Sequence, residues 1–151
     1  MKLPEVLGSQ MVLQSGMPVP VWGEAPPGET VRVLFRGREK TARADAQGRW
    51  RAELDAMEPG GPDPLRVIGA GGSERLLEDV LVGEVWVGSG QSNMERPCSR
   101  FPSDPGLDRW IRAAPYPNLR LFHNGRWQAA STNNLPDFSA LMTAFGIRLH
   151  R

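Results

Sequence analysis

Residues 80–100 of the chain read VLVGEVWVGSGQSNMERPCSR, and the pattern of the sequence changes within this stretch. The segment GEVWVG is short and almost continuously apolar, which is typical of a central parallel strand in an α/β sheet covered on both faces. It leads into Gly88, Gly90, Ser92 and Asn93 with no charge between them. A strand followed by a glycine turn predicts that Ser92 lies exposed at the carboxyl edge of a sheet.

Before this stretch, residues 1–82 contain short β-type runs separated by turns rich in Gly and Pro. Strands about 8–12 residues apart with such turns between them predict an antiparallel sandwich or barrel. Val31, Val33 and Phe35 fall on one side of their strand, so one face should be buried and the other wet. The runs are MVLQ, VPVWG, ETVRVLFRG, KTARADA, RWRAEL, PLRVIG and ERLLEDVLV.

Two local features refine this first part. The turn DAQGRW, with Gln47 and Gly48 at its tip between two alternating runs, predicts a β-hairpin. The aromatic residues Trp22, Phe35 and Trp50 are expected to fill the core of the sandwich.

Residues 83–151 show a different pattern. LDRWIRAA predicts a turn or two of helix, and NLRLFH predicts a further strand. DFSALMTAFGIRLHR predicts a helix that is capped by Asp137 or Ser139 and has an apolar stripe on one side. The stripe consists of Phe138, Leu141, Met142, Phe145 and Leu149. Because two parallel strands bury little and leave open edges, this part is expected to be the opening of an α/β domain, truncated in this chain.

The composition excludes several classes of function. Eighteen basic and 17 acidic residues are spread along the length, so no basic stripe indicates nucleic acid. No apolar run approaches the ~20 residues of a membrane-spanning helix. Cys98 is the only cysteine, so the chain has no internal disulfide and no thiol cluster for a metal such as zinc.

The turn VGSGQSNM admits three interpretations. A dinucleotide fingerprint needs a third glycine where Asn93 stands and a long helix where Pro97 interrupts. A glycine turn with no chemistry is common after a strand. A nucleophile turn would expose Ser92 and aim backbone N–H donors at the reacting carbon, as a serine alkoxide requires. The pattern is not the G-x-S-x-G elbow of the α/β-hydrolases, because Met94 replaces the last glycine.

Sequence motifs favour the third interpretation. SGQSNMERP, preceded by DVLVGEVWV, resembles the first motif block of the sialate O-acetylesterases, carbohydrate esterases of the SGNH hydrolase group. The resemblance continues through GSQMVLQSGMPVPVWGEAPPGETVRVLF and ADAQGRWRAEL before the turn. After the turn it includes YPNLRLF, WQAAS and FSALMTAFGIRLH, so almost the whole chain is covered.

The resemblance implies a fold and a reaction. The fold would be a jelly-roll-like β-sandwich over residues 1–82, followed by the N-terminal part of an SGNH-type α/β domain over residues 83–151. The reaction would remove O-acetyl groups from sialic acids or related sugars by acyl transfer to serine and then water, with no metal and no cofactor. Ser92 matches the nucleophile, and its backbone N–H would be one oxyanion donor. Gln91 and Asn93 match the flanking positions that shape the turn.

Two departures from the family pattern matter. Arg96 stands where the family usually has Trp, so an aromatic wall near the sugar is expected to be absent. The later motif blocks, including the Asp-x-x-His that supplies the base, are expected beyond Arg151. The chain alone is therefore expected to be inactive, with the missing C-terminal part of the hydrolase domain as its partner.

Histidine, cysteine and tryptophan residues outside the turn are further candidates for chemistry. His123 at a strand end and His150 near the terminus do not match the family's base, and solitary histidines of this kind more often serve as surface or hydrogen-bonding residues. Cys98 has no base marked in the sequence, which favours a small buried residue over a nucleophile. Trp110 and Trp127 are candidates for stacking on a sugar.

Two functional classes stay open, a serine esterase and a non-catalytic module that binds carbohydrate or another protein. Trp86 is a third candidate for stacking on a sugar, but its position in the apolar run GEVWVG favours a place in the core.

The localisation is also open. The family is commonly exported, whereas the start MKLPEVLGSQMVLQ lacks the apolar region of a secretory signal.

Overall fold

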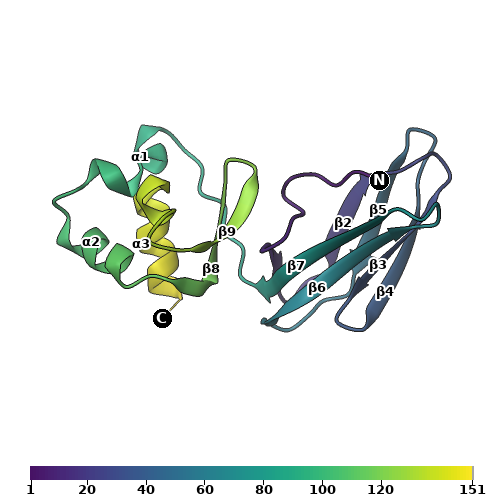
Figure 1. The fold of residues 1–151 in the computed structure, drawn as a ribbon, viewed down its shortest axis with the longest axis horizontal. Helices are drawn as coiled ribbons and strands as arrows, with labels where there is room; N and C mark the ends of the chain where they lie inside the picture. Colours follow the sequence, from purple (N-terminus) through teal and green to yellow (C-terminus); the bar gives the residue numbers. More distant parts are fainter. Residues whose placement is uncertain (151) are drawn as a thin grey trace. The chain divides into compact units, whose positions relative to one another are not determined.

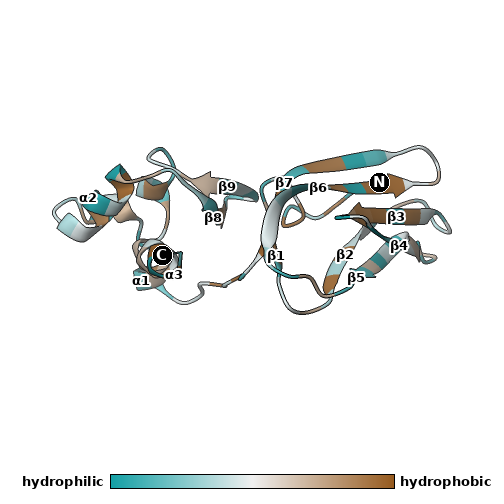
Figure 2. Ribbon diagram, turned by 90° about the horizontal axis from the view of Figure 1, so that it is seen from below, coloured by the Kyte–Doolittle hydropathy of each residue, from teal (hydrophilic) through white to brown (hydrophobic). Residues whose placement is uncertain are grey.

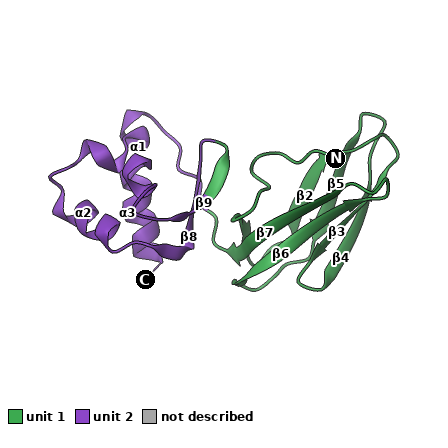
Figure 3. Ribbon diagram, viewed as in Figure 1, with its two compact units in different colours: residues 1–85, 125–127 green, residues 86–124, 128–151 purple. Residues whose placement is uncertain are grey.

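The computed structural model describes residues 1–150, which form two compact units (Figure 3). The first unit comprises residues 1–85 together with 125–127, and the second comprises residues 86–124 and the described residues from 128 onward. Arg151, the last residue of the helix expected at the end of the sequence, lies outside the described residues.

The first unit contains seven strands, one in each of the β-type runs of the sequence (Figure 1). Five form a sheet in the order β1-β7-β6-β3-β4, and β2 pairs with β5 in a second sheet. The predicted mainly β fold is confirmed, although the larger sheet is mixed because β1 runs parallel to β7. The strands are β1 Val12–Gln14, β2 Val19–Glu24, β3 Thr30–Phe35, β4 Arg38–Arg43, β5 Arg49–Leu54, β6 Gly60–Gly69 and β7 Glu74–Gly83.

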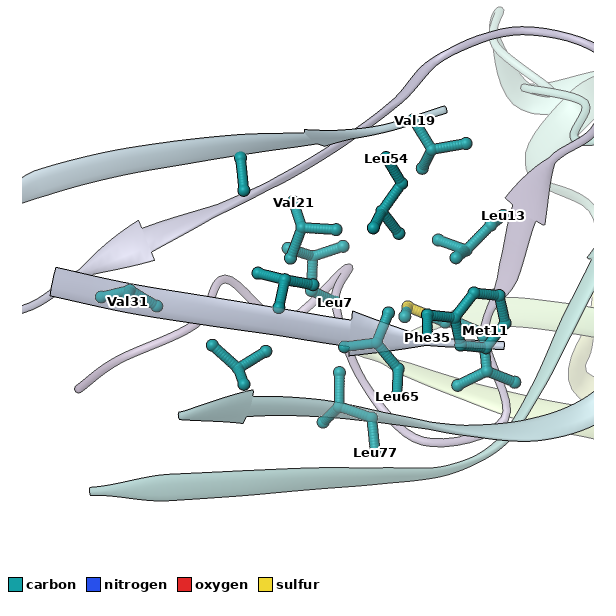
Figure 4. Close-up of a cluster of buried hydrophobic side chains, with 14 of the residues drawn as sticks. Leu7, Met11, Leu13, Val19, Val21, Val31, Phe35, Leu54, Leu65 and Leu77 are labelled. Carbon is teal, nitrogen blue, oxygen red and sulfur yellow. The ribbon is translucent and has the colours of Figure 1, made fainter. Parts of the chain in front are cut away.

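Alternation along the strands places the core between the two sheets. Val31, Val33 and Phe35 are buried, as their shared side predicts, and they contribute to one hydrophobic cluster with residues of both sheets (Figure 4). Hydrophobic and hydrophilic residues both occur along these strands (Figure 2). Trp50 is also buried. The prediction for Trp22 is wrong, since its side chain is 40% exposed. Its position is one residue out of phase with the buried Val21, so it faces the opposite side of β2.

The turn DAQGRW forms, but the hairpin predicted there is wrong. Asp45 Oδ1 accepts hydrogen bonds from the backbone N–H groups of Gln47 at 2.9 Å and Arg49 at 2.8 Å. The bond from the Arg49 N–H is the main cause that holds the pKa of Asp45 below its usual value. The flanking strands pair elsewhere, β4 with β3 and β5 with β2. Strand β4 is an edge strand of the five-stranded sheet and has no buried residue, whereas β5 lies in the second sheet and turns every second residue toward the core.

The second unit is built from short helices and one two-stranded sheet. The predicted helices at LDRWIRAA and FSALMTAFGIRLH and the strand at NLRLFH are confirmed, and the cap of the last helix is Ser139. Strand β8 pairs with β9 across a turn at Asn124 and Gly125. The elements are α1 Ser92–Glu95, α2 Pro105–Arg112, β8 Tyr116–His123, β9 Arg126–Ala130 and α3 Ala140–Leu149, with 3-10 turns at Cys98–Arg100 and Leu135–Asp137.

The parallel strand predicted at GEVWVG is absent. Strand β7 ends at Gly83, and none of residues 84–90 belongs to a strand or helix. Val85, Trp86 and Val87 are 36%, 57% and 88% exposed, so the assignment of Trp86 to a core is also wrong. A strand needs a partner for its backbone N–H and C=O groups. No strand among residues 1–150 pairs with this segment, and β8 pairs with β9 instead.

Helix α3 buries a different face from the predicted stripe. Ala140, Thr143 and Ile147 are buried, whereas Leu141 and Leu149 are exposed.

No helix within residues 1–150 is long and apolar enough to cross a membrane.

Candidate functional site

Ser92 is the first residue of α1 and is exposed, as are its neighbours Gln91 and Asn93. Gly90, two residues earlier, has φ +156°, a backbone conformation that favours glycine. Gln91 is extended, and its carbonyl oxygen accepts the N–H of Met94 at 2.9 Å. The chain therefore bends sharply before Ser92 and presents its hydroxyl to solvent.

The end of this turn is joined to the segment that enters α3. The N–H of Cys98 donates to the carbonyl oxygen of Phe138, and the N–H of Ala140 donates to that of Arg96, both at 2.9 Å. These bonds form an isolated antiparallel bridge between Pro97 and Ser139. Segments about 40 residues apart in the sequence are thereby held side by side.

Gly88, which precedes the turn, lies close to helix α3. A Cβ atom at Gly88 would lie 2.5 Å from Met142 Sδ and 2.7 Å from Met142 Cγ, closer than real Cβ contacts. Close by, the ring of Trp86 meets that of Phe145 edge to face, with 5.2 Å between centroids. The residues before Ser92 thus approach α3 so closely that a side chain at position 88 would require the Met142 side chain to move.

Neither histidine is joined to Ser92. His123 packs edge to face against Phe138 with 5.8 Å between centroids, and His150 packs similarly against Tyr116 at 6.0 Å. Within residues 1–150, no hydrogen bond links either imidazole to the serine hydroxyl. No group of three or more His, Cys, Asp or Glu side chains in that range could hold a metal ion.

Cys98 is a buried thiol, which confirms the prediction that it is a small buried residue. It is 2% exposed, and its Sγ donates to Thr143 Oγ1 at 3.4 Å. Removal from water disfavours the thiolate, so burial raises the pKa of the Cys98 thiol above its ordinary value. A thiol of this kind is a poor nucleophile.

We expect Cys98 to react slowly with a thiol reagent such as Ellman's reagent at pH 8, because the pKa is raised and the sulfur is shielded. Rapid labelling should follow the addition of denaturant. The double variant Cys98→Ser/Ser99→Cys is the matched control, because it moves the single thiol to an exposed neighbour. Equal labelling rates for the two native proteins would contradict the buried thiol.

The remaining tryptophans differ in access. Trp110 is half-buried beside Leu107, with the guanidinium carbon of Arg148 5.9 Å from the centre of its ring. Trp127 is half-buried, and its Nε1–H donates to the carbonyl oxygen of Val6 at 2.8 Å. Trp86 is therefore the most exposed of the three rings considered for sugar stacking.

Sequence reasoning missed one polar link at this site. The hydroxyl of Ser139, expected only as a possible helix cap, donates to the carbonyl oxygen of Met94 at 2.5 Å. The sequence around Ser139 contains a capping signal but nothing that indicates a partner 45 residues away.

Comparison with known proteins gives consistent matches. The chain matches no protein-family profile. It is 35% identical to mouse sialate O-acetylesterase over 112 residues, which are 68% of this chain and 20% of that protein. The rat sialate O-acetylesterase is 37% identical over 119 residues, or 72% of this chain and 21% of that protein. The chain thus spans about a fifth of the length of these curated relatives.

A solved structure agrees with the sequence matches. The structure of a carbohydrate acetylesterase from Xanthomonas citri has a TM-score of 0.88 and 37% sequence identity to this chain. The match covers 98% of this chain and 36% of the acetylesterase. The curated sialate O-acetylesterases and this carbohydrate acetylesterase structure together support the family that the sequence motifs indicate.

Proposed function

We propose that this chain carries the nucleophile of a serine esterase that removes O-acetyl groups from sialic acids or related sugars. The observation that carries the proposal is Ser92, exposed at the start of α1 directly after the Gly90 bend. The similarity to a carbohydrate acetylesterase over nearly the whole chain supports the same reaction class.

In the proposed reaction, Ser92 Oγ forms a bond to the acetyl carbon while its proton passes to a base. The N–H of Ser92 is one donor to the oxyanion that develops on the acetyl oxygen. Collapse of this intermediate breaks the bond to the sugar oxygen, which takes the proton from the base. Water then attacks the acetyl-serine in the same way, releasing acetate and restoring the serine hydroxyl.

The proposed base lies outside these 151 residues. His123 and His150 pack against aromatic rings, and neither is hydrogen-bonded to Ser92 within the described part of the chain. An SGNH-type hydrolase domain, opening in residues 83–151 and completed by further chain, would supply the histidine. Gln91 and Asn93 shape the turn on either side of the nucleophile.

A second candidate function is a non-catalytic module that binds carbohydrate. The exposed ring of Trp86, held edge to face by Phe145, favours it because aromatic faces stack on sugars. Such a module would bind an O-acetylated sugar and leave the ester intact.

A chimeric enzyme separates these functions. This chain would replace the segment that it matches in the Xanthomonas citri acetylesterase, and release of acetate from O-acetylated sialic acid would be measured. We expect the chimera to release acetate. A chimera that melts like its parent and binds the sugar, yet releases no acetate, would support the binding module and contradict the esterase.

The 151-residue chain alone should hydrolyse p-nitrophenyl acetate no faster than its Ser92→Ala variant. Without a base, a serine hydroxyl loses most of its rate advantage. Faster hydrolysis by the unmodified chain would show that a base lies within it, and His123→Ala would then be the first variant to test.

A further inference from the structure

We propose that Ser139 is a positioning residue for the nucleophile, and that its hydroxyl sets the orientation of the helical turn that begins with Ser92. The inference rests on the proposed function for its catalytic consequence. Its structural basis is the contact between α1 and the first turn of α3, which lie side by side (Figure 1).

The Ser139 hydroxyl contacts both α1 and α3. It donates to the carbonyl oxygen of Met94 at 2.5 Å, and it accepts the N–H of Met142 at 3.3 Å. The first contact reaches α1 two residues after Ser92, and the second caps the N-terminus of α3. One oxygen atom therefore connects the nucleophile's helix to a helix of ten residues.

Helix α1 has little else to hold it. It has only four residues, buries none of them and has no side-chain cap at its N-terminus. A single helical turn is not stable by itself in water, because nucleation is costly and its terminal N–H groups lack partners. Packing and local sequence thus determine the orientation of the Ser92 side chain only weakly. A hydrogen bond from outside α1 therefore has a large effect on that orientation.

The backbone contacts nearby do not replace this bond. The bonds from Cys98 to Phe138 and from Ala140 to Arg96 hold the chain after α1 has ended. Of these three bonds, only the one from Ser139 reaches a carbonyl within α1 itself. Since Met94 O belongs to the same turn as Ser92, losing the bond should let that turn shift while the bridge around Pro97 stays in place.

A small shift of a nucleophile has a large kinetic effect. Misplacement by about 1 Å can reduce the rate about 100-fold, because the reacting atoms must meet in a narrow range of geometry. Substrate binding depends less on the position of this single hydroxyl. Loss of the Ser139 bond should therefore lower kcat more than it raises KM.

The test compares three variants in the chimeric enzyme. Ser139→Ala removes both contacts, while Ser139→Thr keeps the hydroxyl. Asp104→Ala is the matched control, because it removes the cap of α2, where Asp104 Oδ1 accepts the N–H groups of Gly106 and Leu107, both at 2.9 Å. We expect Ser139→Ala to lower kcat about 10- to 100-fold with KM within about twofold, and Ser139→Thr to restore most of it.

The outcome that overturns the proposal is a Ser139→Ala variant whose kcat stays within about twofold of the parent. A kcat loss of the same size in Asp104→Ala would also overturn it, because a cap lost elsewhere in the unit would then be equally damaging. Failure of the threonine variant to recover activity, despite a parental melting temperature, would argue against the hydroxyl as the acting group.

A second measurement does not depend on catalysis. In the 151-residue chain, amide hydrogen exchange reports the N–H of Arg96, which donates to the carbonyl oxygen of Ser92 at 3.0 Å. Ser139→Ala should speed this exchange at least about tenfold if α1 opens more often, and Asp104→Ala should not. Unchanged exchange would contradict the positioning role. If the chimera melts like its parent and binds the sugar but releases no acetate, the esterase proposal fails and the exchange result alone decides the role of Ser139.

Discussion

Replacement of Ser92 by alanine in the chimeric acetylesterase is expected to lower kcat at least about 10³-fold, because a serine esterase without its nucleophile keeps only the contributions of binding and the oxyanion donors. Acetate release from an O-acetylated sugar, measured at saturating substrate, reads the effect directly. Ser99→Ala is the matched control, since Ser99 is an exposed serine seven residues further along the chain.

Stability should hardly change in the same variant. Ser92 is exposed and its helix buries no residue, so loss of its hydroxyl should alter the free energy of unfolding by no more than about 0.5 kcal/mol. The assignment of the nucleophile would be wrong if Ser92→Ala retained turnover like Ser99→Ala. It would be unsupported by the kinetics if the variant lost activity only because it melted far below its parent.

Leu65→Ala should destabilise the first unit by about 3–5 kcal/mol, because it opens a cavity among closely packed side chains. Leu65 lies on β6, has no exposed surface and faces the cluster of Figure 4. Domains of this kind have free energies of unfolding of about 5–15 kcal/mol, so a loss of this size should clearly lower the urea concentration at the unfolding midpoint. Unfolding in urea, followed by circular dichroism of the 151-residue chain, measures it.

The matched control is Leu76→Ala on the neighbouring strand β7. Leu76 is 51% exposed and pairs across the sheet with Arg66, one position from the pair formed by Leu65 and Leu77. The same change of side chain should cost less than about 1 kcal/mol there, since surface substitutions usually have small effects. Similar losses at both positions would show that Leu65 is not part of a closely packed core.

The strand segments of the first unit could be predicted from the sequence. Strand alternation acts over two residues and turn formation over about four, so Val31, Val33 and Phe35 indicate a buried face without knowledge of any partner. The same is true of the cap at Ser139, which depends on bonds within one helical turn. The exposed glycine turn that carries Ser92 was also visible, although its chemistry was indicated by resemblance to a family and not by local pattern.

Pairing between strands could not be predicted in this way. The turn after β4 looks like a hairpin locally, but β5 pairs with β2 and not with β4, and its Trp50 faces the core. Likewise, the apolar run from Val85 to Val87 has the composition of a buried strand and forms none, because no strand among the described residues pairs with it. An apolar run with the composition of a strand forms one only where a neighbouring strand can pair with its backbone N–H and C=O groups.

Long-range polar contacts were equally hidden. Ser139 bonds to Met94 and Cys98 to Thr143, each across 45 residues, and no motif marks either pair. Periodicity and caps arise from atoms within a few residues, so a sequence displays them directly. Which distant side chains come within 3.5 Å of one another depends on how whole elements pack, and only the folded chain brings the Ser139 hydroxyl to the turn that presents Ser92.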